Sequence, residues 1–216
     1  MYPVSTSKTS ISSPGTSGSG TSGRRTRMSP SARRDQLIAL GLEMVGNRPL
    51  EQVSIDAIAE VAGVSRALLF HYFESKQDFH VAIARAQAQE MLDCTAPDDS
   101  LGDPLLILGA SMSAFVDYVT ENRTAYMALI RGSASADPAM RAVTDQTRTV
   151  MVERILERAG GLGIESTASV RLAVAGWIAF VEEVTINWLA DAPISRAELL
   201  TLITTSLPAL AVRADG

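Results

Sequence analysis

The chain has 216 residues, of which 46% are hydrophobic and 5% aromatic, so it is long enough to bury a sizeable core. We expect a soluble, cytoplasmic protein without a membrane partner, because no apolar run reaches about 20 uncharged residues and no secretory signal is recognisable. The formal net charge of -5 argues against a protein that coats nucleic acid indiscriminately.

Charge is distributed unevenly along the chain. Residues 24–85 carry nine Lys or Arg against seven Asp or Glu, whereas residues 86–216 carry nine against 17. The first segment can therefore approach a polyanion, and the second repels one.

Residues 1–29 form a tail rich in Ser, Thr and Gly, which we predict to be disordered because it cannot bury enough apolar surface to offset chain entropy. Arg24, Arg25 and Arg27 near its end predict a basic arm that reaches phosphates or the minor groove. The alternative is a solvated tail that only aids solubility.

From Pro30 onward the periodicity is helical, which predicts an all-α fold of about nine helices. The stretch 46–49 ends the first helix. Ser54 is a suitable N-cap for a short second helix that Gly63 stops, and Ser65 caps a short third one.

Longer helices are expected after a fourth helix that Ser75 caps. Their predicted spans are from Asp103-Pro104, 122–131, from Asp137-Pro138 to 160, 166 to about 189, and a last helix after Ser195 that Pro208 should end or kink.

The two short helices at residues 55–73 fit a helix-turn-helix, in which one helix crosses the DNA backbone and the next enters the major groove. Ala59 lets the helices approach closely, and Gly63 supplies the turn. An ordinary helical hairpin inside a larger core is the alternative interpretation.

The stretch 58–76, IAEVAGVSRALLFHYFESK, resembles the signature of the tetracycline-repressor (TetR) family, and the resemblance extends over roughly Arg33 to Ile83. It implies a helix-turn-helix DNA-binding domain at residues 30–75, joined to a helical ligand-binding and dimerisation domain at residues 76–216. The second part resembles the family only in length and helix pattern.

The resemblance also implies a palindromic double-stranded DNA operator and the residues that contact it. Phosphates would be bound by Ser54, Ser65, Tyr72 and Lys76, and the major groove would be faced by Arg66, Ala67, Leu68 and His71. Lys76 at a helix start is disfavoured by the helix dipole, which suggests a phosphate partner. Phe70 replaces the tyrosine usual in the family, and Leu68 replaces a small polar residue, so the operator of relatives does not transfer.

The last two predicted helices carry apolar residues on more than one face, which predicts a homodimer through a four-helix bundle. An ordinary monomer core is the alternative. The stripes consist of Trp177, Val181, Val184 and Trp188, and of Leu199, Leu200, Ile203 and Leu207.

A second apolar set suits an adaptable pocket for a small apolar ligand, or equally plain core. Few cationic residues interrupt it, which favours a neutral ligand over a phosphorylated one. The candidate ligand-binding residues are Met112, Phe115, Val119, Tyr126, Met127, Ile130, Met151, Ile155, Trp177 and Phe180. A ligand there would swing the fourth helix, which starts at Lys76, and so release the operator from a repressor.

The competing hypothesis is a regulator of the same fold without a small-molecule ligand, controlled by a protein partner or by abundance, or acting as an activator. We expect no enzyme and no cofactor, because no nucleophile elbow, phosphate-binding loop or dinucleotide turn appears. No metal site is expected with only His71 and His80, and the lone Cys94 is interpreted as inert.

Overall fold

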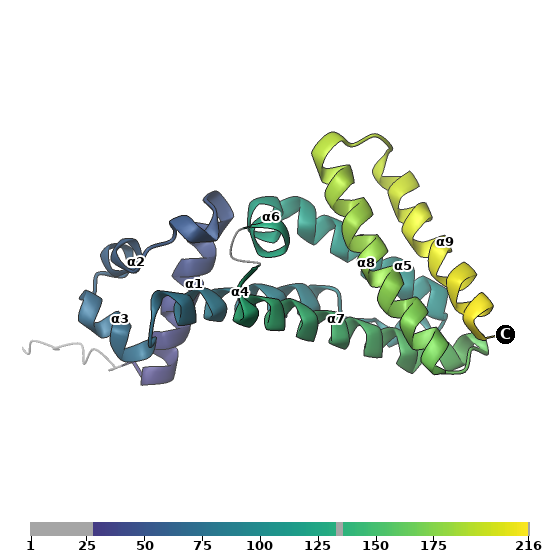
Figure 1. Ribbon diagram of the computed structural model, residues 1–216, viewed down its shortest axis with the longest axis horizontal. Coiled ribbons are helices and arrows are strands. Elements are labelled where there is room, and N and C mark those ends of the chain that lie inside the picture. Colours follow the sequence, from purple (N-terminus) through teal and green to yellow (C-terminus); the bar gives the residue numbers. More distant parts are fainter. Residues whose placement is uncertain (1–27, 133–135, 216) are drawn as a thin grey trace, which may run out of the picture.

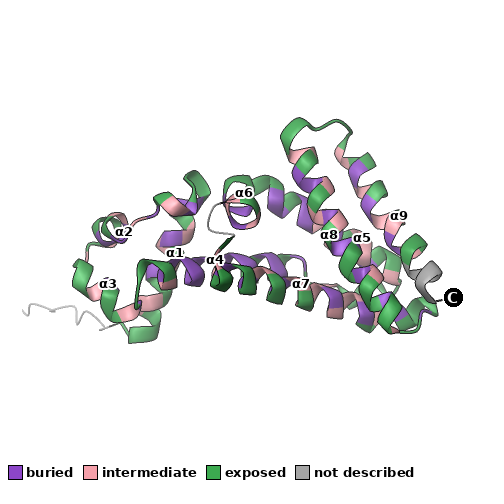
Figure 2. Ribbon diagram, in the orientation of Figure 1, coloured by how far each residue is buried: buried purple, intermediate pink, exposed green. Residues whose placement is uncertain are grey.

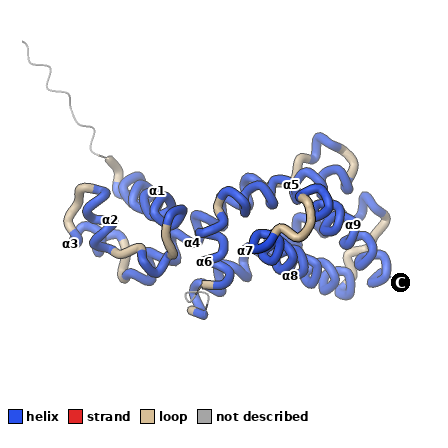
Figure 3. Tube along the Cα trace, turned by 90° about the horizontal axis from the view of Figure 1, so that it is seen from above, coloured by secondary structure: helices blue, strands red, loops and turns tan. Residues whose placement is uncertain are grey.

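The computed structural model describes residues 28–132 and 136–215, and within these ranges the chain has helices and no strand (Figure 3). The prediction of an all-α fold is confirmed. The nine α-helices of these ranges are α1 (Pro30–Asn47), α2 (Ile55–Ala62), α3 (Arg66–Tyr72), α4 (Lys76–Cys94), α5 (Pro104–Glu121), α6 (Arg123–Arg131), α7 (Pro138–Ala159), α8 (Ala168–Asp191) and α9 (Arg196–Asp215). The predicted basic arm, Arg24, Arg25 and Arg27, lies outside the described residues.

Side-chain caps start the helices at the predicted places. Ser54, Ser65 and Ser75 each accept a hydrogen bond from a backbone N–H three residues ahead, at 3.0 to 3.2 Å. Asp103 and Asp137 cap the two helices that begin with proline. Because these bonds satisfy otherwise unpaired N–H groups, the local sequence determines where each helix begins.

Figure 1 shows an elongated molecule with α1, α2 and α3 at one end and α8 and α9 at the other. α4 joins the two ends and packs against both α1 and α7. Gly41 of α1 permits the first contact, since a Cβ there would lie 2.5 Å from Cδ1 of Ile83 on α4. Any larger residue would force the Ile83 side chain, or α1 itself, to shift.

Two buried clusters form the interior (Figure 2). The first is built from α1 to α4 with parts of α6 and α7, and the second from α5 to α9. α4 contributes to both, through Phe79 and Ile83 in the first cluster and Met91 in the second. A shift of α4 must therefore change the packing of both clusters.

α8 and α9 form an antiparallel pair fastened by Trp177, which is fully buried. Its Nε1 donates to the carbonyl of Ile203 at 3.0 Å and to Oγ of Ser206 at 2.9 Å. The large ring fills the space between the helices while its one polar atom is satisfied.

Three details differ from the sequence-based expectations. α9 continues through Pro208 to Asp215, so Pro208 does not end the helix. The neighbouring Leu207 and Ile203 are buried, and this packing overrides the lost backbone hydrogen bond. α8 begins at Ala168 with Thr167 as its cap. Unpredicted 3-10 helices lie at η1 (Leu50–Gln52), η2 (Asp99–Leu101) and η4 (Gly160–Leu162).

By length and composition alone, α8 could cross a membrane. It packs instead against α7 and α9, and Glu182 in its middle pairs with Arg148 of α7. A core helix of a protein without membrane segments passes the same length and composition test.

Candidate DNA interface and ligand cavity

The turn between α2 and α3 depends on Gly63. Its φ of +63° lies in the left-handed region, which side chains with a Cβ rarely adopt. The following N–H, of Val64, donates to the carbonyl of Ala59 at 2.9 Å and closes the end of α2. The two short helices are thereby held at a defined angle.

Inward-facing residues fix the orientation of α3, because Ile58, Leu69 and Phe73 are almost completely buried. Of the residues predicted to face the major groove, Arg66, Ala67 and His71 are exposed, and of those predicted to bind phosphates, Ser65 and Lys76 are exposed. Ser54, Leu68 and Tyr72 are half-buried. Phe70, which replaces the tyrosine usual in the family, is 45% exposed on the same short helix.

Arg66 lies at the first position of α3 and is oriented by two neighbours. Its Nη1 lies 3.2 Å from Oδ1 of Asp56 on α2, and its guanidinium lies 5.6 Å from the centre of the Phe70 ring. Both charged side chains are well exposed, so the ion pair is weak and a guanine can displace the carboxylate. The geometry thus presents Arg66 without fixing it.

Lys76 has a partner that the sequence did not indicate. Its Nζ donates to the backbone carbonyl of Glu51 in η1 at 3.0 Å, which ties the start of α4 to the segment before α2. The ammonium has three donors. Its phosphate contact therefore stays a prediction, beside an observed structural role.

His80 has a structural role that sequence reasoning missed. It is 5% exposed, and its Nε2 lies 2.8 Å from the carbonyl of Val53. The carbonyl can only accept, so Nε2 carries the proton and donates. Burial lowers the pKa of His80 below its ordinary value of 6.5, although the Val53 hydrogen bond opposes this.

This lowered pKa predicts acid sensitivity. The pKa of His80 is lower in the folded protein than in the unfolded chain. Below pH 6.5 the unfolded chain therefore binds more protons than the folded protein. The contribution of His80 to stability is therefore complete above pH 6.5 and decreases as the pH falls below 6.5. Thermal melting followed by circular dichroism should show this decrease.

The exposed His71 is the matched control, because the chain contains only these two histidines. His80→Gln should flatten the pH dependence of the melting temperature below pH 6.5, and His71→Gln provides the same substitution at an exposed position for comparison. Equal pH profiles for wild type and His80→Gln would show that another group causes the acid sensitivity.

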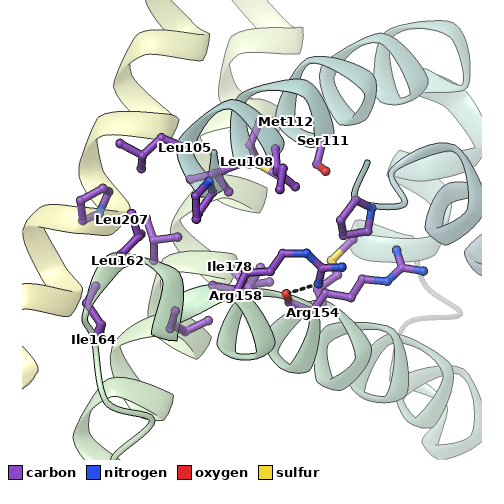
Figure 4. Close-up of a pocket in the computed structure, with 18 of the residues that line it drawn as sticks. Leu105, Leu108, Ser111, Met112, Arg154, Arg158, Leu162, Ile164, Ile178 and Leu207 are labelled. Carbon is purple, nitrogen blue, oxygen red and sulfur yellow. Dashed lines mark hydrogen bonds between the residues drawn. The ribbon is translucent and has the colours of Figure 1, made fainter. Parts of the chain in front are cut away.

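An outer cavity of about 100 Å³ lies among α5, α7, α8 and α9. Figure 4 shows Leu105, Leu108 and Met112 on one side of it, with Ile178 and Leu207 on others. Of the predicted ligand-binding residues, it is lined by Met112, Phe115, Met151 and Ile155. The lining is almost entirely apolar, which suits an apolar ligand.

A smaller inner cavity of about 40 Å³ lies beside it and is reached by α4, α5, α6, α7 and α8. The predicted residues in its lining are Met112, Phe115, Tyr126, Ile130 and Met151. Six of the ten predicted ligand-binding residues therefore line one cavity or both.

The other four predicted ligand-binding residues line neither cavity; they are Val119, Met127, Trp177 and Phe180. Val119 and Trp177 are completely buried in the second cluster, and Met127 and Phe180 pack against its edge. Apolar periodicity identifies all of these as interior, but it does not distinguish a cavity wall from filled core.

The expectation that few cationic residues interrupt the ligand set needs correction. Arg154 and Arg158 of α7 both line the outer cavity (Figure 4). Arg158 pairs with Asp99 at 2.8 Å, whereas Arg154 donates to the carbonyl of Leu92 at 2.7 Å. Their long apolar stems allow both to line an apolar space while their charged ends bind elsewhere.

Two family models match the chain, one for each part. Residues 37–83 match "Bacterial regulatory proteins, tetR family", and residues 104–210 match "Tetracyclin repressor-like, C-terminal domain". The crystal structure of a tetR-family transcriptional regulator from Streptomyces coelicolor is 31% identical, with 87% of this chain and 83% of that chain covered and a TM-score of 0.75. This chain belongs to the TetR family.

Named TetR-like relatives regulate transcription in both directions. The transcriptional activator FasR of Mycolicibacterium smegmatis is 24% identical over 178 residues, or 80% of either chain. The transcriptional repressor KstR2 of the same organism is 31% identical over 80 residues, which are 33% of this chain and 39% of the relative. As a TetR-family member, the protein is a DNA-binding transcriptional regulator of a family that binds operators as dimers and typically responds to ligands.

Proposed function

We propose that this protein is a repressor that binds a palindromic operator as a dimer through α3. It leaves the operator when a small apolar molecule occupies the outer and inner cavities. The observation that carries the proposal is the combination of an exposed α3 face with two adjoining apolar cavities, the smaller of which is lined in part by α4. We expect the protein to act in the cytoplasm. If no ligand releases it from the operator, its activity would be controlled by a protein partner or by its abundance.

We propose that the two parts of the chain have different tasks, although the first buried cluster extends beyond residue 75 into α4, α6 and α7. Residues 30–75 read the operator, residues 76–216 bind ligand and dimerise, and the basic residues of the tail at 1–29 add phosphate contacts. α4 contributes to both clusters, so we assign it the transmission of the ligand signal.

The apolar stripes from which the dimer was predicted lie largely in the chain's own core, since Trp177, Val181, Leu199, Ile203 and Leu207 are buried. We assign dimerisation instead to the outward face of α8 and α9. Leu172 on α8 is 75% exposed, and Leu202 on α9 is also exposed. Between them α8 presents the small exposed residues Ala175, Gly176 and Ala179, and nothing lies within 4 Å of a Cβ placed on Gly176. A second helix pair can therefore approach closely and cover apolar surface.

Operator titration tests the reading residues. Arg66→Ala should lose about 1–3 kcal/mol of binding to the specific operator and little binding to random DNA, because a bidentate guanine contact discriminates between bases. Lys76→Ala should weaken binding to both DNAs alike and reduce the salt dependence, because a phosphate contact carries no sequence information.

Gln77→Ala, at an exposed neighbouring position, is the matched control and should change neither affinity. Melting curves accompany the titration because Lys76 also binds the Glu51 carbonyl. If Arg66→Ala weakened specific and random DNA equally, Arg66 would be a phosphate contact and our assignment of the groove would be wrong.

A further inference from the structure

The inner cavity is separated from the outer one by few side chains. Both cavities are lined by Met112, Phe115, Met151 and Ile178, so these residues form the wall between them. Two of the four are methionines, whose side chains change shape easily. A rotation of these side chains can join the cavities into one elongated space.

Gln87 of α4 lines the inner cavity and carries an unsatisfied donor. The residue is 5% exposed, and its Nε2 has no hydrogen-bond partner. The Tyr118 hydroxyl donates to the backbone carbonyl of Gln87 at 3.1 Å. The same hydroxyl also lies near the side-chain amide of Gln87, but the two groups do not form a hydrogen bond. Buried polar atoms are normally paired, so this one calls for a partner.

Most of the remaining polar groups of the inner cavity are already engaged, and the exception is the Tyr126 hydroxyl, which has no hydrogen bond to any described residue. Glu182 receives hydrogen bonds from Nε and Nη2 of Arg148 at 2.6 to 3.1 Å, and the Thr147 hydroxyl donates to the carbonyl of Val143 at 2.8 Å. Among the described side-chain atoms that are completely buried, the only one besides Nε2 of Gln87 without a partner is Oγ1 of Thr185, which lines neither cavity. Within the part of the chain that the structure describes, the unpaired polar groups of this space are therefore the Gln87 amide nitrogen, which is buried on α4, and the Tyr126 hydroxyl on α6.

We propose that the inner cavity binds an uncharged oxygen of an elongated apolar ligand, with Nε2 of Gln87 as the donor and the apolar body in the outer cavity. The inference rests on the proposed function and names the ligand class of the same site. A carboxylate in place of the neutral oxygen is disfavoured, because no cationic side chain of the described residues lines the inner cavity and Arg148 nearby is already paired with Glu182.

This placement links ligand binding to the DNA reader. Gln87 and Lys76 lie on the same helix, about 16 Å apart along its axis. A ligand that draws the Gln87 side chain toward the joined cavity acts on α4, which also packs against α1 through Gly41. Gln87 thus both selects the ligand, through its hydrogen bond, and transmits ligand binding to α4.

The test compares three probes of equal chain length, which are decane, decanol and decanoate. Full-length wild type, Gln87→Leu and the exposed control Gln77→Leu are titrated with each probe, and Trp fluorescence and operator release are measured. In wild type and Gln77→Leu, decanol should bind tighter than both other probes. In Gln87→Leu, the ratio of decanol to decane affinity should fall about 10-fold, because one buried hydrogen bond is lost.

A second readout is the stability of the ligand-free protein. Gln87→Leu should melt at a higher temperature than wild type, because an unpaired buried donor is removed without changing the side-chain length greatly. Gln87→Met provides the same comparison with a flexible side chain, in case the branched leucine cannot be accommodated.

The outcomes are distinguishable. In one outcome, decane and decanol bind the protein and cause operator release while their affinity ratio stays the same in Gln87→Leu as in wild type. This result would overturn the role of Gln87 and leave the proposed function standing. Tighter binding of decanoate than of decanol to wild type would overturn the uncharged ligand class. If none of the three probes bound to wild type, both the ligand class and the proposed release by a small apolar ligand would be overturned.

Discussion

Ala179→Arg should convert the protein to a monomer and weaken operator binding by about 100-fold or more, since two linked readers gain an effective concentration that a single reader lacks. Ala179 lies on the exposed face of α8 near Gly176, where a neighbouring helix can approach closely. Once that helix is in contact, a guanidinium group at position 179 would have no space. Sedimentation velocity measures the oligomeric state, and an operator titration measures the affinity.

Ala179→Ser is the matched control, because a small side chain keeps the close approach. It should remain a dimer with nearly the affinity of wild type. A dimeric Ala179→Arg variant with normal operator affinity would place the interface elsewhere, and a monomeric variant with normal affinity would show that a single reader suffices.

Trp177→Ala should lower the free energy of unfolding by about 3–5 kcal/mol, the loss typical of a large buried aromatic side chain. The ring is completely buried between α8 and α9, and its Nε1 bridges the Ile203 carbonyl and the Ser206 hydroxyl. Denaturant unfolding at a fixed protein concentration measures the loss, since dimerisation makes stability depend on concentration.

Trp188→Ala is the control on the same helix. Trp188 is half-buried, and its Nε1 donates to the Ile194 carbonyl at 2.8 Å in the loop after α8. It should lose clearly less stability than Trp177→Ala. Equal losses for the two variants would mean that the α8 and α9 pair does not depend on the buried ring.

The DNA reader was the part most accessible to sequence reasoning. Its decisive features are local: Ser54 and Ser65 bond to N–H groups three residues ahead, and Gly63 adopts a backbone conformation that other residues resist. Interactions over three or four residues can be predicted from spacing alone. The resemblance to the TetR family rested on the same short stretch, and its membership is confirmed.

The ligand cavity was predicted less completely. Met112 and Met151 were identified and do line both cavities, but Trp177 and Val119 share the same apolar periodicity and belong to filled core. Whether an apolar residue faces a void depends on the shapes of neighbours from other helices. Such neighbours lie far away in the sequence, so no periodicity reveals them.

By itself, the sequence determined the all-α class, the beginnings of most helices and the exposure of Arg66, Ala67 and His71 on α3, because caps, turns and helical periodicity act over a few neighbouring residues. Only the tertiary structure decided that α9 continues through Pro208, that Lys76 binds the Glu51 carbonyl and that Gln87 is buried without a partner for its amide nitrogen. Each of these depends on groups brought together by packing across helices, and the free energy of that packing exceeds local preference.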